Sequence, residues 1–182
     1  MRRPDGAALR ALELEARQRG TGLGGSGAAS APHPLTGTWL LAQLWSARGA
    51  QPIPLTAALL RSFGACLQLG ECQADGRFPL RNRVSLAALR LEFSGFGLLV
   101  GKRPLLVFGF DTLALHWGER LLWQRQLPAE LEASSLQRSR RQPFFALIAL
   151  DREEGWLAAR GRGGGLALWT LQAASQGVPR QS

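Results

Sequence analysis

Residues 144–171 read Phe-Phe-Ala-Leu-Ile-Ala-Leu, Asp-Arg-Glu-Glu-Gly, Trp-Leu-Ala-Ala-Arg, Gly-Arg-Gly-Gly-Gly and Leu-Ala-Leu-Trp-Thr-Leu. Three short apolar runs are separated by two polar or glycine-rich clusters, a pattern typical of a three-strand antiparallel meander. The middle run is too short for a helix of useful length, and the glycines between 161 and 165 tolerate the positive φ that a tight hairpin needs. We therefore predict that this segment forms the last strands of a closed β-sheet.

The chain before this meander carries more strand signals. Leu35–Trp45 reads as a first strand, in which alternation puts Trp45 on the same face as Trp39. Further apolar runs recur at intervals of about eight to twelve residues, a spacing typical of sandwiches and barrels. They cover residues 65–71, 78–84, 88–93, 96–100, 105–110, 113–117 and 121–127. Because glycine and proline interrupt the chain after residue 64, the sequence predicts an all-β fold, a single antiparallel barrel.

The N-terminal part is organised differently. Residues 1–20 predict a short helix, with Asp5 as its cap and Leu9 and Leu12 at helical spacing. Residues 21–34 are rich in Gly, Ser and Ala, which predicts a flexible linker. The remaining divisions are the barrel at 35–172, one short helix at 55–63 after its first strand, and a disordered tail at 173–182.

Arginine dominates the charge of the chain. The formal net charge is +9 and the pI is about 11.5, and Lys102 is the only lysine. Such an excess favours contact with a polyanion, although a GC-rich genome also produces an arginine bias. The cluster Arg138, Arg140 and Arg141 is the better candidate for peripheral contact with an anionic membrane surface, and we expect no nucleic-acid partner.

The residue types that carry catalysis or metal binding are sparse. Cys66, Cys72, His33 and His116 do not have the spacing of a zinc site, and His116 alternates with apolar residues on a predicted strand. We therefore expect no catalytic residue, no metal and no cofactor, so that the protein is not an enzyme. The chain also has neither a secretory signal pattern nor an apolar run long enough to span a bilayer.

Aromatic and aliphatic side chains recur on nearly every predicted strand. A small barrel either fills its interior with such side chains or leaves a cavity for one apolar ligand, and alternation does not separate these two cases. Strand position selects six lining candidates for an apolar ligand: Leu91, Phe93, Phe108, Phe110, Trp123 and Phe145.

Two motifs, supported by the middle of the chain, resemble a known family. Gly37-Thr-Trp39 is similar to the Gly-x-Trp element that opens the first strand of lipocalin-like barrels. The run from Arg160 to Leu168 resembles the Arg-Gly-x-x-Gly-x-Leu ending of the plastid-lipid-associated proteins, or fibrillins, and Leu105–Leu113 is similar to their middle strands. The chain departs from that pattern at Ala167, where the family has an aromatic residue, and in lacking the arginine of the preceding Leu-Arg step.

The resemblance implies a lipocalin-like barrel that binds a lipid, a prenylquinone or another apolar molecule without catalysis. It further implies a location in the cytoplasm or at the periphery of cyanobacterial thylakoid membranes. Four family residues carry over, with Gly37 and Gly161 as structural positions and Trp39 and Arg160 as ligand-site positions. We predict that Trp39 packs under the guanidinium of Arg160 and closes the barrel base by a cation–π contact.

Two other functions are open at this level. Lipocalin-like barrels also serve as lyases or chaperones for bilin chromophores, which would need a charged pair gripping propionates inside the cavity. A basic surface together with the Arg-Gly run would suit a nucleic-acid binder, whose affinity would fall steeply with salt. The mid-strand charges Arg90, Glu92 and Arg125 are expected to point outward, which favours the apolar-ligand reading.

Overall fold

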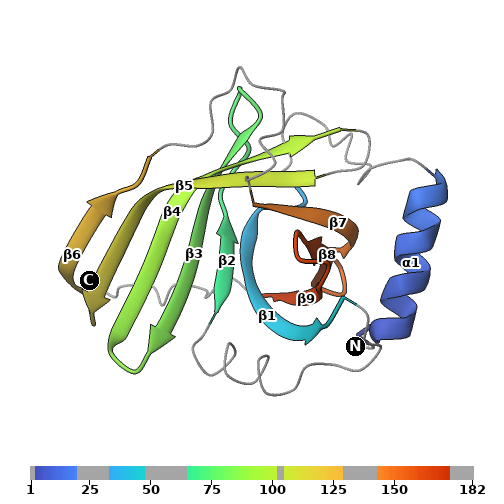
Figure 1. Cartoon of the computed structure of the whole chain (residues 1–182), viewed down its shortest axis with the longest axis horizontal. Coiled ribbons are helices and arrows are strands. Elements are labelled where there is room, and N and C mark those ends of the chain that lie inside the picture. Colours follow the sequence, from blue (N-terminus) through green and yellow to red (C-terminus); the bar gives the residue numbers. More distant parts are fainter. Residues whose placement is uncertain (1–2, 20–32, 48–64, 102–104, 129–142, 173–182) are drawn as a thin grey trace, which may run out of the picture.

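A computed structural model describes residues 3–19, 33–47, 65–101, 105–128 and 143–172. Within these ranges the chain forms one helix, α1 (Gly6–Arg19), and nine strands (Figure 1). The strands are β1 (Gly37–Trp45), β2 (Cys66–Leu69), β3 (Arg77–Leu86), β4 (Leu89–Val100), β5 (Leu105–Trp117), β6 (Arg120–Gln126), β7 (Phe144–Asp151), β8 (Trp156–Gly161) and β9 (Leu166–Leu171). The predicted short helix at 55–63, the tail at 173–182 and the cluster Arg138, Arg140 and Arg141 lie outside the described residues.

The strands form one antiparallel sheet that closes on itself as a ring. The order is β4-β3-β2-β1-β9-β8-β7-β5-β6, and β4 also pairs with β5. The first half of β5 pairs with β7 at Leu105–Val107, and its second half pairs with β6 at Thr112–Trp117. Strand β6 therefore lies outside the ring as an edge strand. The prediction of a mostly antiparallel β structure with one N-terminal helix is confirmed for the described residues, and their sheet is ring-like.

The predicted C-terminal meander is present as β7, β8 and β9. These strands are joined by the tight turns that the polar and glycine-rich clusters predicted, with positive φ at Gly155 and Gly164. In the second turn the Gly164 N–H donates to the carbonyl of Gly161 at 2.9 Å. Glycine is favoured at both positions because a side chain would strain this backbone conformation.

Strands β4 and β5 are each twice as long as the sequence pattern predicts. The predicted pairs of short strands at 88–93 and 96–100, and at 105–110 and 113–117, are wrong, since each pair is one continuous strand. Ser94 pairs with Thr112 and Gly95 with Phe110, so that Asp111 is the extra residue of a β-bulge. A Cβ atom at Gly95 would overlap the carbonyl oxygen of Gly109. Glycine is required here because two backbones approach closely, and it does not mark a turn.

A second bulge, in β1, changes which side chains face inward. Trp39 and Leu41 belong to the cluster inside the ring, and the register with β9 then shifts between Leu41 and Gln43. Beyond this shift Trp45 packs in a different cluster on the outer face. The prediction that Trp45 shares a face with Trp39 is therefore wrong, because one extra residue reverses the alternation.

Helix α1 covers the outer face of the strands that include the meander. Asp5 caps it as predicted, with its carboxylate accepting a hydrogen bond from the Ala8 N–H at 2.8 Å. Leu9 is fully buried against a cluster of outward-facing side chains from β1, β7, β8 and β9. We call this the covered cluster; it contains Leu9, Trp45, Ile148, Ala158, Leu166 and Leu168.

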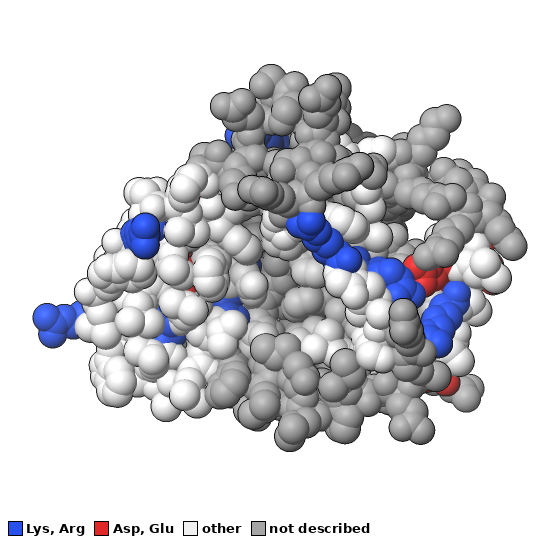
Figure 2. All heavy atoms as spheres, in the orientation of Figure 1, with Lys and Arg blue, Asp and Glu red and all other residues white. Residues whose placement is uncertain are grey.

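Charge is distributed unevenly over the visible face of the molecule (Figure 2). Lys, Arg, Asp and Glu gather on the side near α1, whereas the opposite end, over β4, β5 and β6, is mostly uncharged with separate basic side chains. No described helix is long and apolar enough to cross a membrane.

Candidate apolar-ligand site

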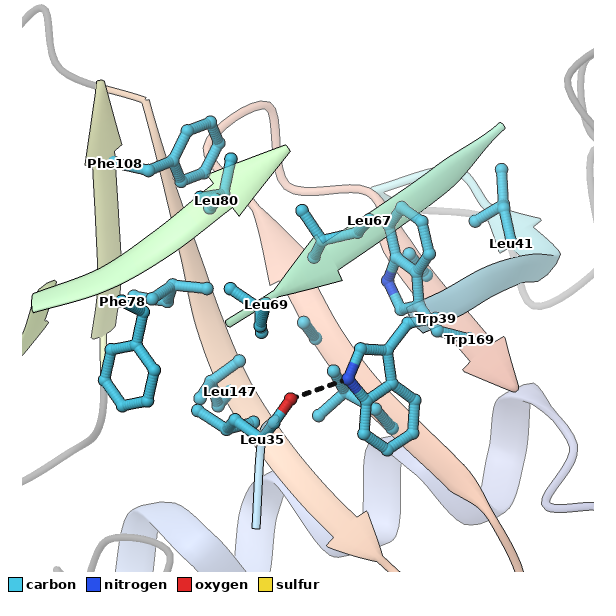
Figure 3. Close-up of a cluster of buried hydrophobic side chains, with 14 of the residues drawn as sticks. Leu35, Trp39, Leu41, Leu67, Leu69, Phe78, Leu80, Phe108, Leu147 and Trp169 are labelled. Atoms are coloured by element: carbon cyan, nitrogen blue, oxygen red, sulfur yellow. Dashed lines mark hydrogen bonds between the residues drawn. The ribbon is translucent and has the colours of Figure 1, made fainter. Parts of the chain in front are cut away.

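The interior of the ring is occupied by apolar side chains contributed by nearly every strand (Figure 3). Trp39 lies at one end of this cluster with none of its surface exposed, and its Nε1–H donates to the carbonyl of Leu35 at 2.8 Å. That bond satisfies the polar atom of the indole, as burial requires. Trp39 is thus buried in the core of the ring with its polar atom satisfied.

A row of five aromatic side chains crosses the ring interior, with neighbouring ring centroids 5.0–6.1 Å apart. We call it the aromatic row; in order it comprises Trp169, Phe145, Phe108, Phe110 and Phe93. These centroid separations lie in the range of favourable aromatic pairing. Four of the six lining candidates, which the sequence could place only strand by strand, are brought together here.

The aromatic row runs from a buried end to a half-buried end. Phe108 and Trp169 are each 8% exposed, whereas Phe145 between them and Phe110 and Phe93 at the other end are partly buried. Phe93 pairs with Leu113 and Leu91 with Leu115, so that the apolar surface continues along β4 and β5. Leu91 is thus next to the half-buried end of the row. An apolar molecule that enters the ring from the long strands would meet Phe93 and Phe110 first.

Trp123 is separate from the other lining candidates. It lies on the edge strand β6, where 47% of its surface is exposed, and it pairs with Leu115. Alternation could not reveal this position, because it shows which residues share a face but not whether a strand lies within the ring. Trp123 therefore belongs to the surface beyond the ring.

The predicted contact between Trp39 and Arg160 is wrong. Arg152, in the turn between β7 and β8, places its guanidinium 5.8 Å from the centre of the Trp39 ring. Its Nη1 also donates to the carbonyls of Thr36 at 2.6 Å and Pro34 at 3.2 Å. Sequence reasoning missed Arg152 because a charged turn residue normally reads as solvated, and no local pattern links it to a strand more than a hundred residues earlier.

Arg160 is on the outer face of β8 and fastens α1 to the sheet. Its Nε and Nη2 donate to the Glu13 carboxylate at 2.7 and 2.5 Å, and Nη1 donates to the carbonyl of Gly164. The hydrogen bonds from Glu13 raise the pKa of Arg160 above its usual value. Such a two-pronged pair between partly buried groups fixes geometry as well as charge.

The two glycines carried over from the family motif differ in how much room they leave for a side chain. Gly37 has a φ of 141°, and a Cβ there would lie 2.8 Å from a methyl group of Leu171. Gly161 lies opposite Phe145 in the register of β7 and β8, and its N–H donates to the carbonyl of Gly165 at 2.9 Å. Gly37 therefore favours a residue without a side chain, whereas a Cβ at Gly161 would make only ordinary contacts, 3.9 Å from the Gly165 carbonyl oxygen.

A separate hollow of about 490 Å³ lies beside β1, where β2 no longer pairs with it. Its size falls within the range of small-molecule pockets. It contains none of the sequence-predicted site residues and is lined by Arg3, Leu40, Leu41, Ala42, Gln43, Ala65 and Thr170.

Groups able to bind metal or act as nucleophiles are scattered among the described residues. In these ranges no three His, Cys, Asp or Glu side chains are close enough to share a metal ion. Burial raises the pKa of the Cys66 thiol, which disfavours the reactive thiolate at neutral pH. The chemistry that the ring interior offers is therefore apolar contact.

Comparisons with models of known families, with curated proteins and with solved structures gave no match. The resemblance to fibrillins thus rests on the sequence motifs alone and stays a prediction.

Proposed function

We propose that the ring is a lipocalin-like barrel that binds one apolar small molecule, such as a lipid or prenylquinone, without catalysis and at a membrane surface. The observation that carries the proposal is the aromatic row, which links the buried centre of the ring to half-buried Phe93 and Phe110. Partly buried rings at one end of the row suit a flat or extended apolar ligand, because stacking on these rings replaces their contact with water.

The first test is native mass spectrometry, with organic extraction, of the full chain purified from a pigment-bearing host. We expect a co-purifying quinone, carotenoid or lipid at near-stoichiometric ratio. The second test is a titration with a short-chain prenylquinone, followed by quenching of tryptophan fluorescence. Trp39 and Trp169 lie inside the ring and would report its occupation.

Substitutions at the half-buried end of the aromatic row test whether the ligand binds there. We expect Phe93→Ala and Phe110→Ala each to weaken quinone binding about tenfold, which corresponds to the loss of about 1.4 kcal/mol of contact. Leu14→Ala on α1, where the leucine is 59% exposed, is the matched control and should bind normally. Trp39→Ala should instead lower the melting temperature, and its effect on stability should be larger than its effect on quinone affinity.

Two results would refute the proposal: a bare protein that takes up no quinone, or normal binding by folded Phe93 and Phe110 variants. An affinity for nucleic acid that falls steeply with salt, and that the Phe93 and Phe110 variants leave unchanged, would favour the basic-surface alternative. Uptake of a bilin that depends on a charged pair would favour the chromophore alternative.

A further inference from the structure

Large apolar side chains are exposed mainly at one end of the molecule. The described residues include eight such side chains, and six of them lie at the ends of the β3–β4 and β5–β6 hairpins or along β6. We call this surface the apolar end; it consists of Leu86, Leu89, Trp117, Leu121, Leu122 and Trp123, which are 36–59% exposed. A concentration of this kind marks a binding surface more often than scattered single residues do.

The two hairpin ends are joined into one surface. Leu89 pairs with Trp117 at the last position of the β4–β5 register, and the Gly118 N–H donates to the carbonyl of Ala88 at 2.7 Å. The two turns therefore lie side by side and project together from the sheet (Figure 1). Strand β6 extends this surface along the edge.

The turn of the β3–β4 hairpin is apolar despite a conformational cost. Leu86 pairs with Leu89, which leaves Ala87 and Ala88 as a two-residue turn, and Ala87 has a positive φ of 50°. Asn, Asp or Gly would adopt this conformation more easily. Alanine at this exposed position keeps the tip free of polar side chains, which suits contact with an apolar medium.

Basic residues surround the apolar end. Arg120 and Arg125 are exposed on β6. Arg90 on β4 has its Nη1 3.8 Å from Oε1 of Glu119, which is 96% exposed in the β5–β6 turn. This end of the molecule is mostly uncharged in Figure 2, with separate basic side chains. Arginine stems can lie along apolar surface while their guanidinium groups reach phosphates.

We propose that the apolar end docks on an anionic lipid surface, with its Trp and Leu side chains at the boundary between headgroups and acyl chains. Arg120 and Arg125 then meet the lipid phosphates, as basic residues do beside inserted aromatic anchors. This proposal deepens the membrane association of the proposed function and does not require a ligand in the ring.

Two features favour lipid over a protein partner. The exposed apolar side chains stand on two projecting turns and one edge strand and not on a broad flat face, whereas a stable protein interface uses roughly 20–30 residues per side. The two arginines on the edge strand also oppose pairing with a second copy through β6, since charged side chains are a common defence of exposed edges. A lipid surface needs neither a large flat area nor a matching edge.

The experiment is flotation of the full chain with vesicles of phosphatidylcholine, with and without phosphatidylglycerol. We expect binding that is tightest on the anionic vesicles. The double variant Trp117→Ser/Trp123→Ser should lower the partition coefficient at least tenfold on both vesicle types. Arg120→Gln/Arg125→Gln should weaken binding to the anionic vesicles and flatten its salt dependence, whereas Leu14→Ser should change neither.

Additional readouts separate this proposal from its rivals. Thermal melting should be the same for all these variants, and quinone binding in the absence of vesicles should persist in the tryptophan double variant. Normal vesicle binding by the tryptophan double variant would overturn the proposal. Failure of the wild-type protein to bind either vesicle type would overturn it as well. A concentration-dependent dimer that the same variant abolishes, without vesicle binding, would assign the surface to a second copy instead.

Discussion

Two apolar surfaces lie outside the core of the ring, and the chain treats them differently. The covered cluster, on the outer face of β1 and the meander, is sealed by α1, and Leu9 and Trp45 there are 0% and 2% exposed. The apolar end, on the long hairpins, has no cover among the described residues and leaves Trp117 and Trp123 about half exposed. The difference indicates that the covered cluster stabilises the fold, whereas the apolar end is available to bind a partner or a membrane.

The covered cluster is also bordered by a well-buried ion pair that joins α1 to the sheet. Glu13 on α1 and Arg160 on β8 bind each other through two donor–acceptor pairs at the rim of the apolar contact. The pair fixes the position of the helix, because both side chains are mostly buried, 14% and 21% exposed. Removing tryptophan or charge from each surface should therefore have very different consequences.

The largest effect is expected for Trp45→Ala. We expect it to lower the free energy of unfolding by about 3–5 kcal/mol, because it leaves a cavity under α1. Urea denaturation followed by circular dichroism measures this loss. A change below about 1 kcal/mol would mean that the helix contributes little to the fold.

The next effect is expected for the ion pair. Glu13→Gln should destabilise the protein by about 1–3 kcal/mol, since it leaves the partly buried Arg160 guanidinium without its anion. Glu153→Gln in the exposed β7–β8 turn is the control and should leave stability unchanged. A double-mutant cycle with Arg160→Gln checks the coupling, and additive single effects would contradict the pairing.

A smaller, pH-dependent effect is expected at the end of the ring opposite the apolar end. Burial lowers the pKa of His33 below 6.5, with Glu71 opposing it, and neutral His33 accepts a hydrogen bond from the Leu35 N–H and packs edge-on against Phe78. The unfolded chain therefore binds the proton more tightly, so stability is full above pH 6.5 and falls as the pH drops below it.

Melting temperatures between pH 7 and 5 test this effect. The wild type should lose stability across that window, and His33→Asn should show a flatter profile, because asparagine keeps an acceptor but does not titrate. An identical slope in both proteins would assign the pH dependence to other groups.

The smallest effect on stability is expected at the apolar end. Trp117→Ala should change the free energy of unfolding by no more than about 0.5 kcal/mol, because the side chain is 59% exposed in the folded protein. Urea denaturation beside Trp45→Ala makes the comparison direct, as both changes remove one tryptophan. A loss of several kcal/mol would show that another part of the chain or a partner buries this surface.

The sequence predicted features that depend on near neighbours. Alternation and glycine clusters predict the meander. The sequence also predicts Asp5 as the helix cap, because the N–H that a cap binds lies only three residues further along the chain. Strand position also selects the aromatic lining candidates, and four of them form one row. These successes share a cause: side-chain direction on a strand or helix is set by local periodicity.

The tertiary structure alone decided which strands continue and which residues meet. Residues 94–95 and 111–112 separate predicted short strands, yet Asp111 is only the extra residue of a bulge inside two long strands that pair from end to end. A similar bulge moved Trp45 to the face that α1 covers. Arg152, and not Arg160, reached Trp39, since ring closure brings a late turn against the first strand. The sequence thus determined the direction of each side chain on its own strand or helix. The partners of these side chains were determined by strand register and ring closure, because both depend on residues far apart in the sequence.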